Sequence, residues 1–516
     1  MAGVPTSFDG ASGTIEVAER DSDAPGFLRW GRLEYVGGHY LKFRDGPYWL
    51  KSGANSPENF LGYSGFDNTP QAQHSFTAHV GDWRAGNPVF DTSSVDGGKG
   101  LIGALNYLSL QGVNSIYFMP MNIGGDGRDS SPYVGPVDWA GSPSNDNLHF
   151  DVSKLKQWQV AFAYAQRERI HLHFVLNEAE EANKRELDDG ALGIERKLFY
   201  REMVARFSQH LAIQWNISEE YDHLYPLSPE AIKEFAGYIQ QVDPYDHPIT
   251  VHQLADPGIT WKPLLGDERF STTAFQYPGR YAGHGDEVER WRRLTAAAGR
   301  PLVISVDELE SATPTNASDQ RKKILWPTYF SGGQLEWYVK EEDQTLEDFR
   351  RYEELWTYTR YARLFMQRRL PFWEMEPQDW LLTGEPTDFG RGQVFAKPGE
   401  LYAVYLPTAT TTGTLDLSGV SGVFQKRWYN PRTGVFDAAV STVMGGGSVA
   451  LGTPPDSPSE DWVVLLESID TGQSTTGFTL INADTDQPIA SLTDGMTLNL
   501  AMLPTRHLGY APTSLL

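Results

Sequence analysis

Two pairs of adjacent acids follow two apolar segments that read as buried strands. Glu219 and Glu220 follow the fourth such segment of the chain, and Asp307 and Glu308 follow the seventh. Cleavage of a glycosidic bond requires one acid that protonates the leaving oxygen and one carboxylate on the other side of the sugar. Any one of these acids alone is more commonly a cap or a salt-bridge partner. Their joint occurrence on the fourth and seventh segments favours catalysis.

Other polar and aromatic side chains stand where the predicted strands end or in the loops that follow. Barrel enzymes carry their functional groups at the C-terminal ends of the strands. For the aromatic residues, including Trp83, Tyr133 and Tyr338, a platform for sugar rings and core packing are equally good interpretations. We expect substrate contacts from Glu58, Asp67, Trp139, Glu178, Glu180, Asn216, His252 and Trp337.

Metal chemistry has weaker support. His171 and His173 lie two residues apart on one predicted strand, so both face the same side, as metal ligands would. A buried pair that packs the barrel wall is the better interpretation. The loop at residues 124–129 carries two acids, and a turn is favoured there over a calcium site. The sequence contains no GxSxG, GxxxxGK or HExxH motif. We expect neither a metal nor a cofactor.

Short apolar segments alternate with longer amphipathic stretches from residue 26 to 385, which is typical of repeated βα units. Near-continuous apolar strands indicate a parallel sheet buried on both faces. Helices are predicted to open at Ser228-Pro229 and at Thr345-x-x-Asp348. No glycine-rich dinucleotide loop follows a strand, so a (β/α)8 TIM barrel is preferred to a doubly wound sheet. The eight predicted strands are residues 48–54, 115–121, 170–176, 212–217, 248–252, 272–276, 302–306 and 333–338.

The pattern changes after residue 385 to short strands separated by Gly, Pro, Asp and Ser, which predicts an antiparallel β-sandwich. Its strands are expected at residues 393–396, 402–406, 412–417, 426–430 and 462–466. We divide the chain into a flexible leader (1–25), a catalytic barrel (26–385), an accessory sandwich (386–468) and a linker with a partial β module (469–516).

The charge of the chain excludes several classes of partner. The net charge is −24 over 516 residues, whereas nucleic acids and anionic membranes demand a basic surface. No apolar run is long enough to span a bilayer. The absence of cysteine excludes disulfides, thiolate metal sites and a cysteine nucleophile. The first residues lack a signal-peptide pattern, but work on an external polymer predicts a secreted or periplasmic protein whose signal has been removed.

Several motifs resemble a bacterial cellulase-like family of glycoside hydrolases whose members carry a C-terminal domain described as collagen-binding. The likeness extends over residues 26–468, and nothing in the sequence itself points to collagen. The matching segments are residues 53–61 (GANSPENFL), 66–67 (FD), 150–155 (FDVSKL), 172–176 (LHFVL), 215–216 (WN), 219–220 (EE), 306–308 (VDE), 402–406 (YAVYL) and 428–434 (WYNPRTG).

The resemblance implies a clan A barrel, in which retaining glycosidases carry the acid/base after strand four and the nucleophile after strand seven. The usual strand-four dipeptide is Asn-Glu, and Glu219-Glu220 stands in its place here. Matching the dipeptides makes Glu220 the acid/base, puts Glu219 near the sugar 2-hydroxyl and makes Glu308 the nucleophile. Glu219 and Asp307 remain alternatives. Because side chains alternate along a strand, only one member of each acid pair should point inward.

The predicted function is therefore hydrolysis of a polysaccharide or oligosaccharide through a covalent glycosyl-enzyme. One alternative is a carbohydrate-binding barrel without turnover. The other is a polysaccharide lyase, which is disfavoured because no Tyr–His–Arg cluster stands out. The sequence leaves open the sugar, the linkage and the oligomeric state.

Overall fold

A computed structural model describes residues 20–469 except 70, 92–95, 127–128, 136–144, 255, 278–282, 310–311, 340–341 and 386–390, together with residues 10 and 12–14. The core of the fold is a parallel sheet whose strands fall where the sequence predicts them. They are β3 (Ser52–Ala54), β4 (Ser115–Phe118), β5 (His171–Val175), β6 (Ile213–Asn216), β7 (Ile249–Thr250), β8 (His252–Gln253), β9 (Ala274–Tyr277), β10 (Ser305–Leu309) and β11 (Gln334–Trp337).

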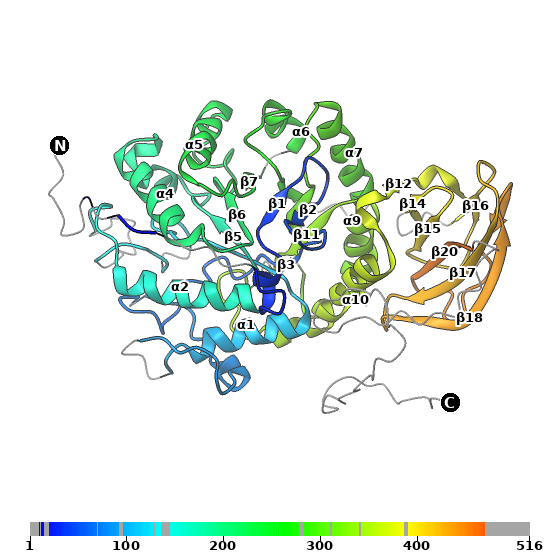
Figure 1. Ribbon diagram of the computed structural model, residues 1–516, viewed down its shortest axis with the longest axis horizontal. Helices are drawn as coiled ribbons and strands as arrows, with labels where there is room; N and C mark the ends of the chain where they lie inside the picture. The colour runs from blue at the N-terminus through cyan, green and yellow to red at the C-terminus, as the bar shows by residue number, and fades with distance from the viewer. Residues whose placement is uncertain are drawn as a thin grey trace. The chain divides into compact units, whose positions relative to one another are not determined.

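These strands close into a barrel (Figure 1). Their order is β7-β6-β5-β4-β3-β11-β10-β9-β8, and the neighbouring pairs are parallel. The two ends of this order, β7 and β8, are separated in the chain by Val251 alone, so they are halves of one interrupted strand. The sheet is therefore an eight-stranded barrel, which confirms the predicted (β/α)8 fold.

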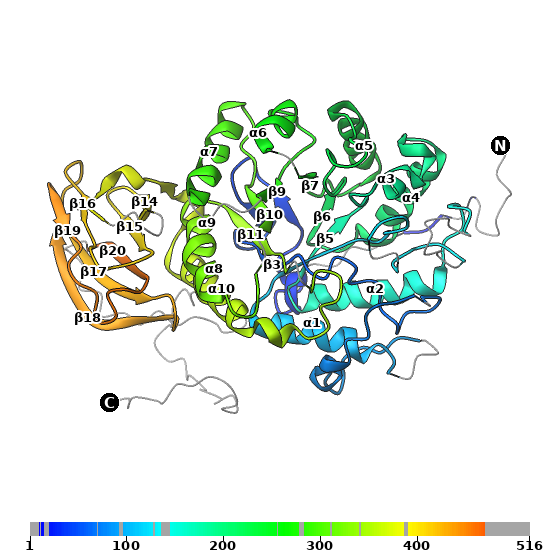
Figure 2. The same ribbon diagram turned by 180° about the vertical axis from the view of Figure 1, so that it is seen from behind.

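Helices of the βα units surround the strands (Figure 2). Ser228 caps α5 as predicted, because its hydroxyl accepts a hydrogen bond from the amide of Ala231 at 3.1 Å. The predicted start at Thr345 is wrong: the Asp348 carboxylate caps a 3-10 turn, Phe349–Tyr352, and the α-helix follows that turn. The helices are α1 (Lys99–Gln111), α2 (Val152–Arg167), α3 (Glu181–Glu186), α4 (Ile194–Phe207), α5 (Pro229–Val242), α6 (Pro257–Thr260), α7 (His284–Ala297), α8 (Ala317–Gln320), α9 (Trp326–Phe330) and α10 (Glu353–Arg369).

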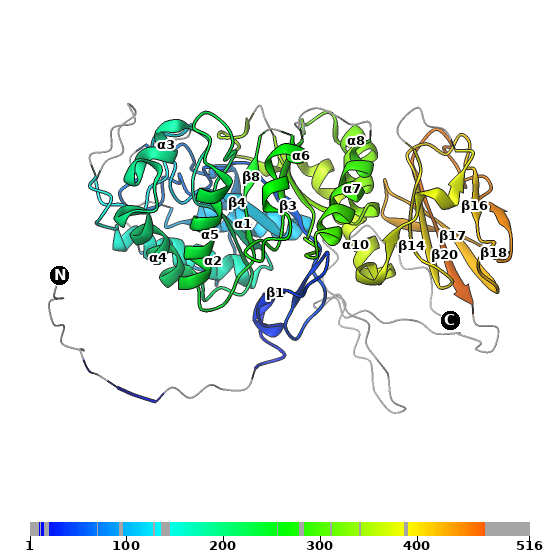
Figure 3. The same cartoon turned by 90° about the horizontal axis from the view of Figure 1, so that it is seen from above.

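A hairpin of β1 (Leu33–Tyr35) and β2 (Leu41–Phe43) covers the N-terminal end of the barrel (Figure 3). Its apolar side chains form a small core with Ala212 and Val303, which precede two barrel strands. The amide of Leu33 also donates to the carbonyl of Leu211 at 2.7 Å. Because this end is closed, the C-terminal ends of the strands form the open mouth.

Two antiparallel sheets follow the barrel and enclose a second apolar core. This confirms the predicted sandwich, although four of its strands, β12, β13, β18 and β19, were not predicted. The six-stranded sheet has the order β12-β14-β15-β20-β17-β18, and the three-stranded sheet has the order β13-β16-β19. The strands are β12 (Glu376–Pro377), β13 (Leu382–Thr383), β14 (Gln393–Lys397), β15 (Leu401–Leu406), β16 (Thr414–Asp416), β17 (Val423–Asn430), β18 (Val435–Met444), β19 (Ser448–Ala450) and β20 (Trp462–Ile469).

Barrel and sandwich share a packed, charged contact. The Arg321 guanidinium donates to both carboxylate oxygens of Asp461, at 2.9 and 2.8 Å, and both side chains are buried. Trp326 of α9 stacks on Tyr405 of β15 with ring centroids 5.5 Å apart. Among the described residues, no helix is both long and apolar enough to cross a bilayer.

Candidate active site

Carboxyl groups from strands four and seven of the barrel meet at its mouth. One oxygen of Glu219, one of Glu308 and a ring nitrogen of His252 all lie within 4.8 Å of one another. The Tyr117 hydroxyl donates to Glu219 Oε1 at 3.1 Å and lies 3.4 Å from His252 Nδ1. The Gln276 amide donates to Glu308 Oε1 at 2.6 Å. Four strands, β4, β6, β8 and β9, thus hold this cluster around the end of β10.

Both acids of the strand-seven pair point into the barrel, contrary to the expectation that only one would. The register of β10 against β9 shifts between Val306 and Glu308, so Asp307 is an extra residue at a bulge. A bulge interrupts the alternation of side chains and re-aims the residue that follows. Asp307 consequently faces the barrel interior, whereas Glu308 faces the mouth next to Gln276.

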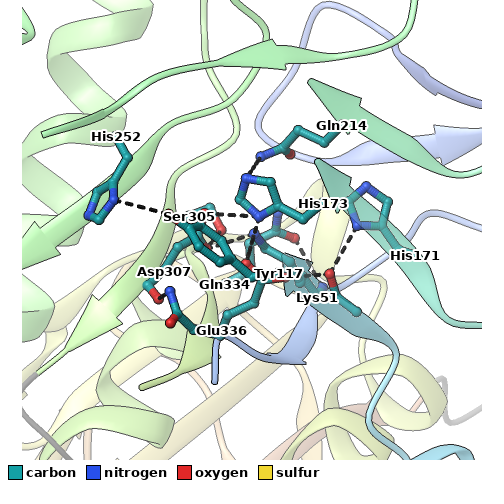
Figure 4. A network of polar contacts seen from close by, with 12 residues as sticks. Lys51, Tyr117, His171, His173, Gln214, His252, Ser305, Asp307, Gln334 and Glu336 are labelled. Atoms are coloured by element: carbon teal, nitrogen blue, oxygen red, sulfur yellow. Dashed lines mark hydrogen bonds and ion pairs between the residues drawn. The ribbon is translucent and has the colours of Figure 1, made fainter. Parts of the chain in front are cut away.

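A layer of buried charge lies beneath the mouth (Figure 4). The Lys51 ammonium donates to Asp307 Oδ1 at 2.7 Å and to Glu336 Oε2 at 3.2 Å, and all three side chains are fully buried. His173 Nδ1 lies 2.7 Å from Glu336 Oε2, and Ser115 donates to the other Glu336 oxygen. Burial opposes the charge on Glu336, but Lys51 and His173 hold its pKa well below the usual range.

A glycine makes room for this layer. A Cβ on Gly53 of β3 would lie 2.5 Å from the Glu336 Cγ and 2.8 Å from the Ser115 Cβ. His171 joins the same layer, because its Nδ1 lies 2.9 Å from the Ser115 hydroxyl. The two strand histidines therefore pack inside the barrel, as the preferred interpretation of the sequence had it. The Lys51 ammonium lies where His173, Asp307 and Glu336 would otherwise hold a cation.

The carboxyl groups at the mouth resist ionisation. Burial raises the pKa of Glu308 well above its usual range, and the charges of Glu219, Glu220 and Asp343 raise it further. The pKa of Glu58 is raised in the same way, by burial first and then by Asp343 and Glu219. The pKa of Asp343 reaches about 7, chiefly through burial. The cluster therefore retains protons near neutral pH and carries groups able to act as a general acid.

The two acids of strand four differ in their surroundings. Glu219 is enclosed: it accepts from Tyr117, shares a hydrogen bond with Glu58, and its pKa is raised well above the usual range by burial. Glu220 adopts the left-handed region, with φ of 33°, and is the more exposed of the two. Burial raises its pKa, while a hydrogen bond from Gln276, the amide that also holds Glu308, lowers it.

A second acidic group adjoins the mouth. Glu178 Oε1 accepts from the amide of Asp126 at 3.0 Å, and burial raises the pKa of Glu178 well above its usual range. The pKa of Glu180 rises to about 7, through burial and its hydrogen bond with Asp126. Gly125 is required here, because a Cβ at that position would meet a Glu178 oxygen at 1.1 Å. Asp129 of the same loop accepts from Asn122 at 2.9 Å, which fits the predicted turn.

Some of the expected substrate contacts lie elsewhere. Trp337 is buried and donates its indole N–H to Thr359 of α10 at 2.8 Å, because alternation along β11 turns it away from the barrel interior, into which Glu336 points. Asp67 lines a surface cavity beside α2. Tyr133 is buried in the hydrophobic core, and Trp83 is a partly buried residue that packs against the same core. Trp139 lies outside the described residues.

Other expected contacts are at the mouth. Glu58 adjoins Glu219, and His252 lies between Glu219 and Glu308. Asn216 is fully buried one layer below, and neither of its amide atoms has a hydrogen-bond partner among the described residues. The sequence reading missed Tyr117, Gln276, Asp343 and Lys51. Tyr117, Gln276 and Lys51 lie inside predicted strands, where they could have been selected by strand position. Asp343 carries no local signal.

Comparisons with known proteins agree with this architecture. Residues 377–467 match the family model "Putative collagen-binding domain of a collagenase". A glycoside hydrolase family 5 protein from Bacteroides vulgatus is similar in structure, with a TM-score of 0.62 and 15% sequence identity over 87% of this chain and 96% of that one. Another structure, described as a glycoside hydrolase, has a TM-score of 0.64 and 14% identity over 86% of this chain and 99% of that one. No curated protein matches the sequence significantly.

At these identities the structural likeness establishes the fold. The match at residues 377–467 begins at the first strands of the sandwich and ends within β20. The chain therefore joins a barrel with the fold of glycoside hydrolases to a C-terminal domain of the collagen-binding model, as the resemblance in its motifs predicted.

Proposed function

We propose that the chain is a retaining glycoside hydrolase that acts on a polysaccharide or oligosaccharide. The observation that carries the proposal is the meeting of Glu219 and Glu220 with Glu308 at the open end of the barrel, around one shared amide, that of Gln276. Retaining enzymes hold their two carboxyl groups about 5–5.5 Å apart, whereas inverting enzymes leave room for a water between them. Hydrogen bonds from one amide, that of Gln276, to both Glu220 and Glu308 bring these two carboxyl groups near each other, which supports retention.

Glu308 is the proposed nucleophile. Its carboxylate oxygen attacks the anomeric carbon while the bond from that carbon to the leaving oxygen breaks. Gln276 orients it through the 2.6 Å hydrogen bond, and Asp307 cannot replace it because Lys51 and Ser305 hold the Asp307 carboxylate below the mouth. The nucleophile must be ionised, so activity should rise with pH through the elevated pKa of Glu308.

Glu220 is the proposed acid/base. It is more open to the mouth than Glu219 and shares Gln276 with Glu308. In the first step it gives its proton to the leaving oxygen. In the second it takes a proton from water, whose oxygen bonds to the anomeric carbon and releases Glu308. Glu219, fixed by Tyr117 and Glu58, would contact the sugar beside the nucleophile. We also propose an extracellular or periplasmic location, where such polymers are found.

The test is release of reducing ends from a panel of plant and algal polysaccharides, with three variants. Glu308→Gln should abolish turnover on every substrate. Glu220→Gln should abolish it on the polymer but retain activity on aryl glycosides whose leaving group needs no proton, whereas Glu219→Gln should show no such selectivity. Glu289→Gln on α7, a buried acid away from the mouth, is the control.

Three outcomes would contradict the proposal. Full activity in Glu308→Gln would remove the nucleophile assignment. Selectivity for activated substrates in Glu219→Gln in place of Glu220→Gln would exchange the roles of the two strand-four acids. Binding of a glycan without release of reducing ends from the parent protein would show a barrel that binds carbohydrate and does not turn it over. The anomer formed first, followed by proton NMR, reports retention directly.

A further inference from the structure

A buried histidine nitrogen faces a carboxyl oxygen at the mouth of the barrel. His252 is fully buried, and its Nε2 atom has no hydrogen-bond partner in the part of the chain that the structure describes. That atom lies 3.5 Å from Glu308 Oε2. A neutral imidazole, the form that binds a metal, carries one N–H only. The position of that N–H decides what Nε2 offers to its surroundings.

Tyr117 assigns the proton of His252 to Nδ1. In the ionised form that binds a metal, Glu219 can only accept, so the Tyr117 hydroxyl donates its one proton to Glu219 Oε1 at 3.1 Å. Toward His252 Nδ1, at 3.4 Å, the same oxygen is therefore an acceptor. Nδ1 carries the hydrogen, and Nε2 presents a lone pair to the Glu308 carboxyl. This is the tautomer of a metal-binding histidine, whose other ring nitrogen is oriented by a hydrogen bond.

The spacing of the surrounding atoms fits a small divalent cation. Zinc bonds to histidine nitrogen and carboxylate oxygen at about 2.0–2.2 Å, so two ligands of a tetrahedral site lie about 3.4 Å apart. His252 Nε2 and Glu308 Oε2 are 3.5 Å apart. Glu219 is the third candidate ligand, since one of its oxygens, one oxygen of Glu308 and one ring nitrogen of His252 all lie within 4.8 Å of one another. We propose that Glu219, His252 and Glu308 bind one divalent cation of the Zn²⁺ type at the barrel mouth, leaving one coordination position open.

Two other groups of potential metal ligands in the described chain differ from this one, because a basic side chain pairs with the carboxylates of each. Lys51 pairs with Asp307 and Glu336 inside the barrel. Arg391 lies 3.0 Å from Asp286 and 3.4 Å from Asp379 in a third group. Among the residues that the structure describes, neither Glu219 nor Glu308 forms an ion pair with a lysine or an arginine.

The mouth therefore differs from these two groups, because Lys184, whose charge acts on Glu219 and Glu220, donates to the backbone carbonyls of Glu220 and His223. The carboxyl groups of Glu58, Glu220 and Asp343 also adjoin it. A bound ion would occupy the carboxyl groups proposed for catalysis. Zinc and substrate should then exclude each other, and zinc should act as a competitive inhibitor. This last consequence rests on the proposed function, whereas metal binding itself does not.

The test is titration calorimetry of the full chain with ZnCl₂ at pH 7, after dialysis against a chelator. One ion should bind per chain. His252→Asn and Glu308→Gln should each weaken binding at least about 100-fold, and Tyr117→Phe, which frees the second nitrogen, about 10–100-fold. His149→Gln is the matched control, because His149 and Asp146 form an exposed pair at 2.6 Å that is the alternative place for zinc. MgCl₂, a hard cation that prefers oxygen ligands, should bind far more weakly.

Thermal unfolding establishes that each variant is folded before it is titrated. Should a variant unfold, Co²⁺ bound to the parent chain gives a second readout: its visible absorption should be intense and typical of four-coordinate nitrogen and oxygen ligation. The proposal is overturned if the parent chain binds no zinc stoichiometrically, or if His149→Gln abolishes binding while His252→Asn preserves it. Neither result depends on finding a substrate, so the metal site and the hydrolase activity fail separately.

Discussion

Replacement of Lys51 by methionine tests the buried charged layer beneath the mouth. Lys51 is fully buried and contacts carboxylates at 2.7 and 3.2 Å. At an effective dielectric constant of about 20, these contacts are worth roughly 6 and 5 kcal/mol before the desolvation of the ammonium is subtracted. Removal of one partner from a buried ion pair costs about 3–5 kcal/mol, because the remaining charge has no compensation. We expect Lys51→Met to lose that much free energy of unfolding at pH 7.

The loss of unfolding free energy in Lys51→Met should depend on pH, and the direction of that dependence follows from Glu336. In the parent chain the folded pKa of Glu336 is depressed, so its stabilising contribution is present above the usual value of 4.5 and is lost only as the pH falls toward the folded value. Without Lys51, burial favours the neutral acid, and the variant loses stability as the pH rises above 4.5. The difference between parent and variant should therefore grow from pH 4.5 to pH 8. Lys51→Met/Glu336→Gln should recover part of it.

Urea unfolding followed by circular dichroism measures the difference, and Lys397→Met is the matched control. Lys397 also contacts two carboxylates, Glu374 at 2.9 Å and Glu400 at 2.7 Å, but this group lies at the surface. Solvent screens such pairs, so its removal should have little effect. A Lys51→Met variant no less stable than Lys397→Met, or a loss that is constant from pH 4.5 to pH 8, would refute the proposed role of the buried layer.

Three further changes probe other parts of the fold. Arg321→Met should cost up to about 3–5 kcal/mol of unfolding free energy, because it leaves the buried Asp461 carboxylate with only the longer contacts to Arg432 (3.5 Å) and Tyr405 (3.4 Å); equal stability of variant and parent in urea would contradict this. Burial raises the pKa of Asp379 to about 7, so its carboxyl destabilises the folded chain as the pH rises past its unfolded pKa. Asp379→Asn can keep the hydrogen bond from the Val394 amide (2.7 Å) and should raise the melting temperature at pH 8 relative to the parent more than at pH 5; a uniform shift would exclude titration as the cause. Ser228→Ala removes the cap of α5 and should cost about 1 kcal/mol, whereas Ser228→Asn, which restores a cap, should not.

Local patterns in the sequence determined the barrel strands and the position of the acids along them. Each buried strand needs a short, nearly continuous apolar run, and acids that follow such runs are carried to the C-terminal end of the sheet. This is why Glu219, Glu220 and Glu308 could be selected as candidates without a structure. Five sandwich strands were likewise visible through their turn residues. The strands β12, β13 and β19 are only two or three residues long, and β18 has largely exposed side chains that lack the alternation of a half-buried strand, so these four were missed.

Only the tertiary structure decided which side chains meet. The register shift at Asp307 turns two adjacent acids inward, and neither residue type encodes a bulge. Lys51 pairs with a carboxylate 256 positions away, a contact set by the closure of the barrel. The same closure brings His252 beside Glu308, whereas strand alternation sends Trp337 toward α10. Burial and apolar periodicity are properties of neighbouring residues, but ion pairing, tautomer choice and bulges depend on groups brought together by the whole fold.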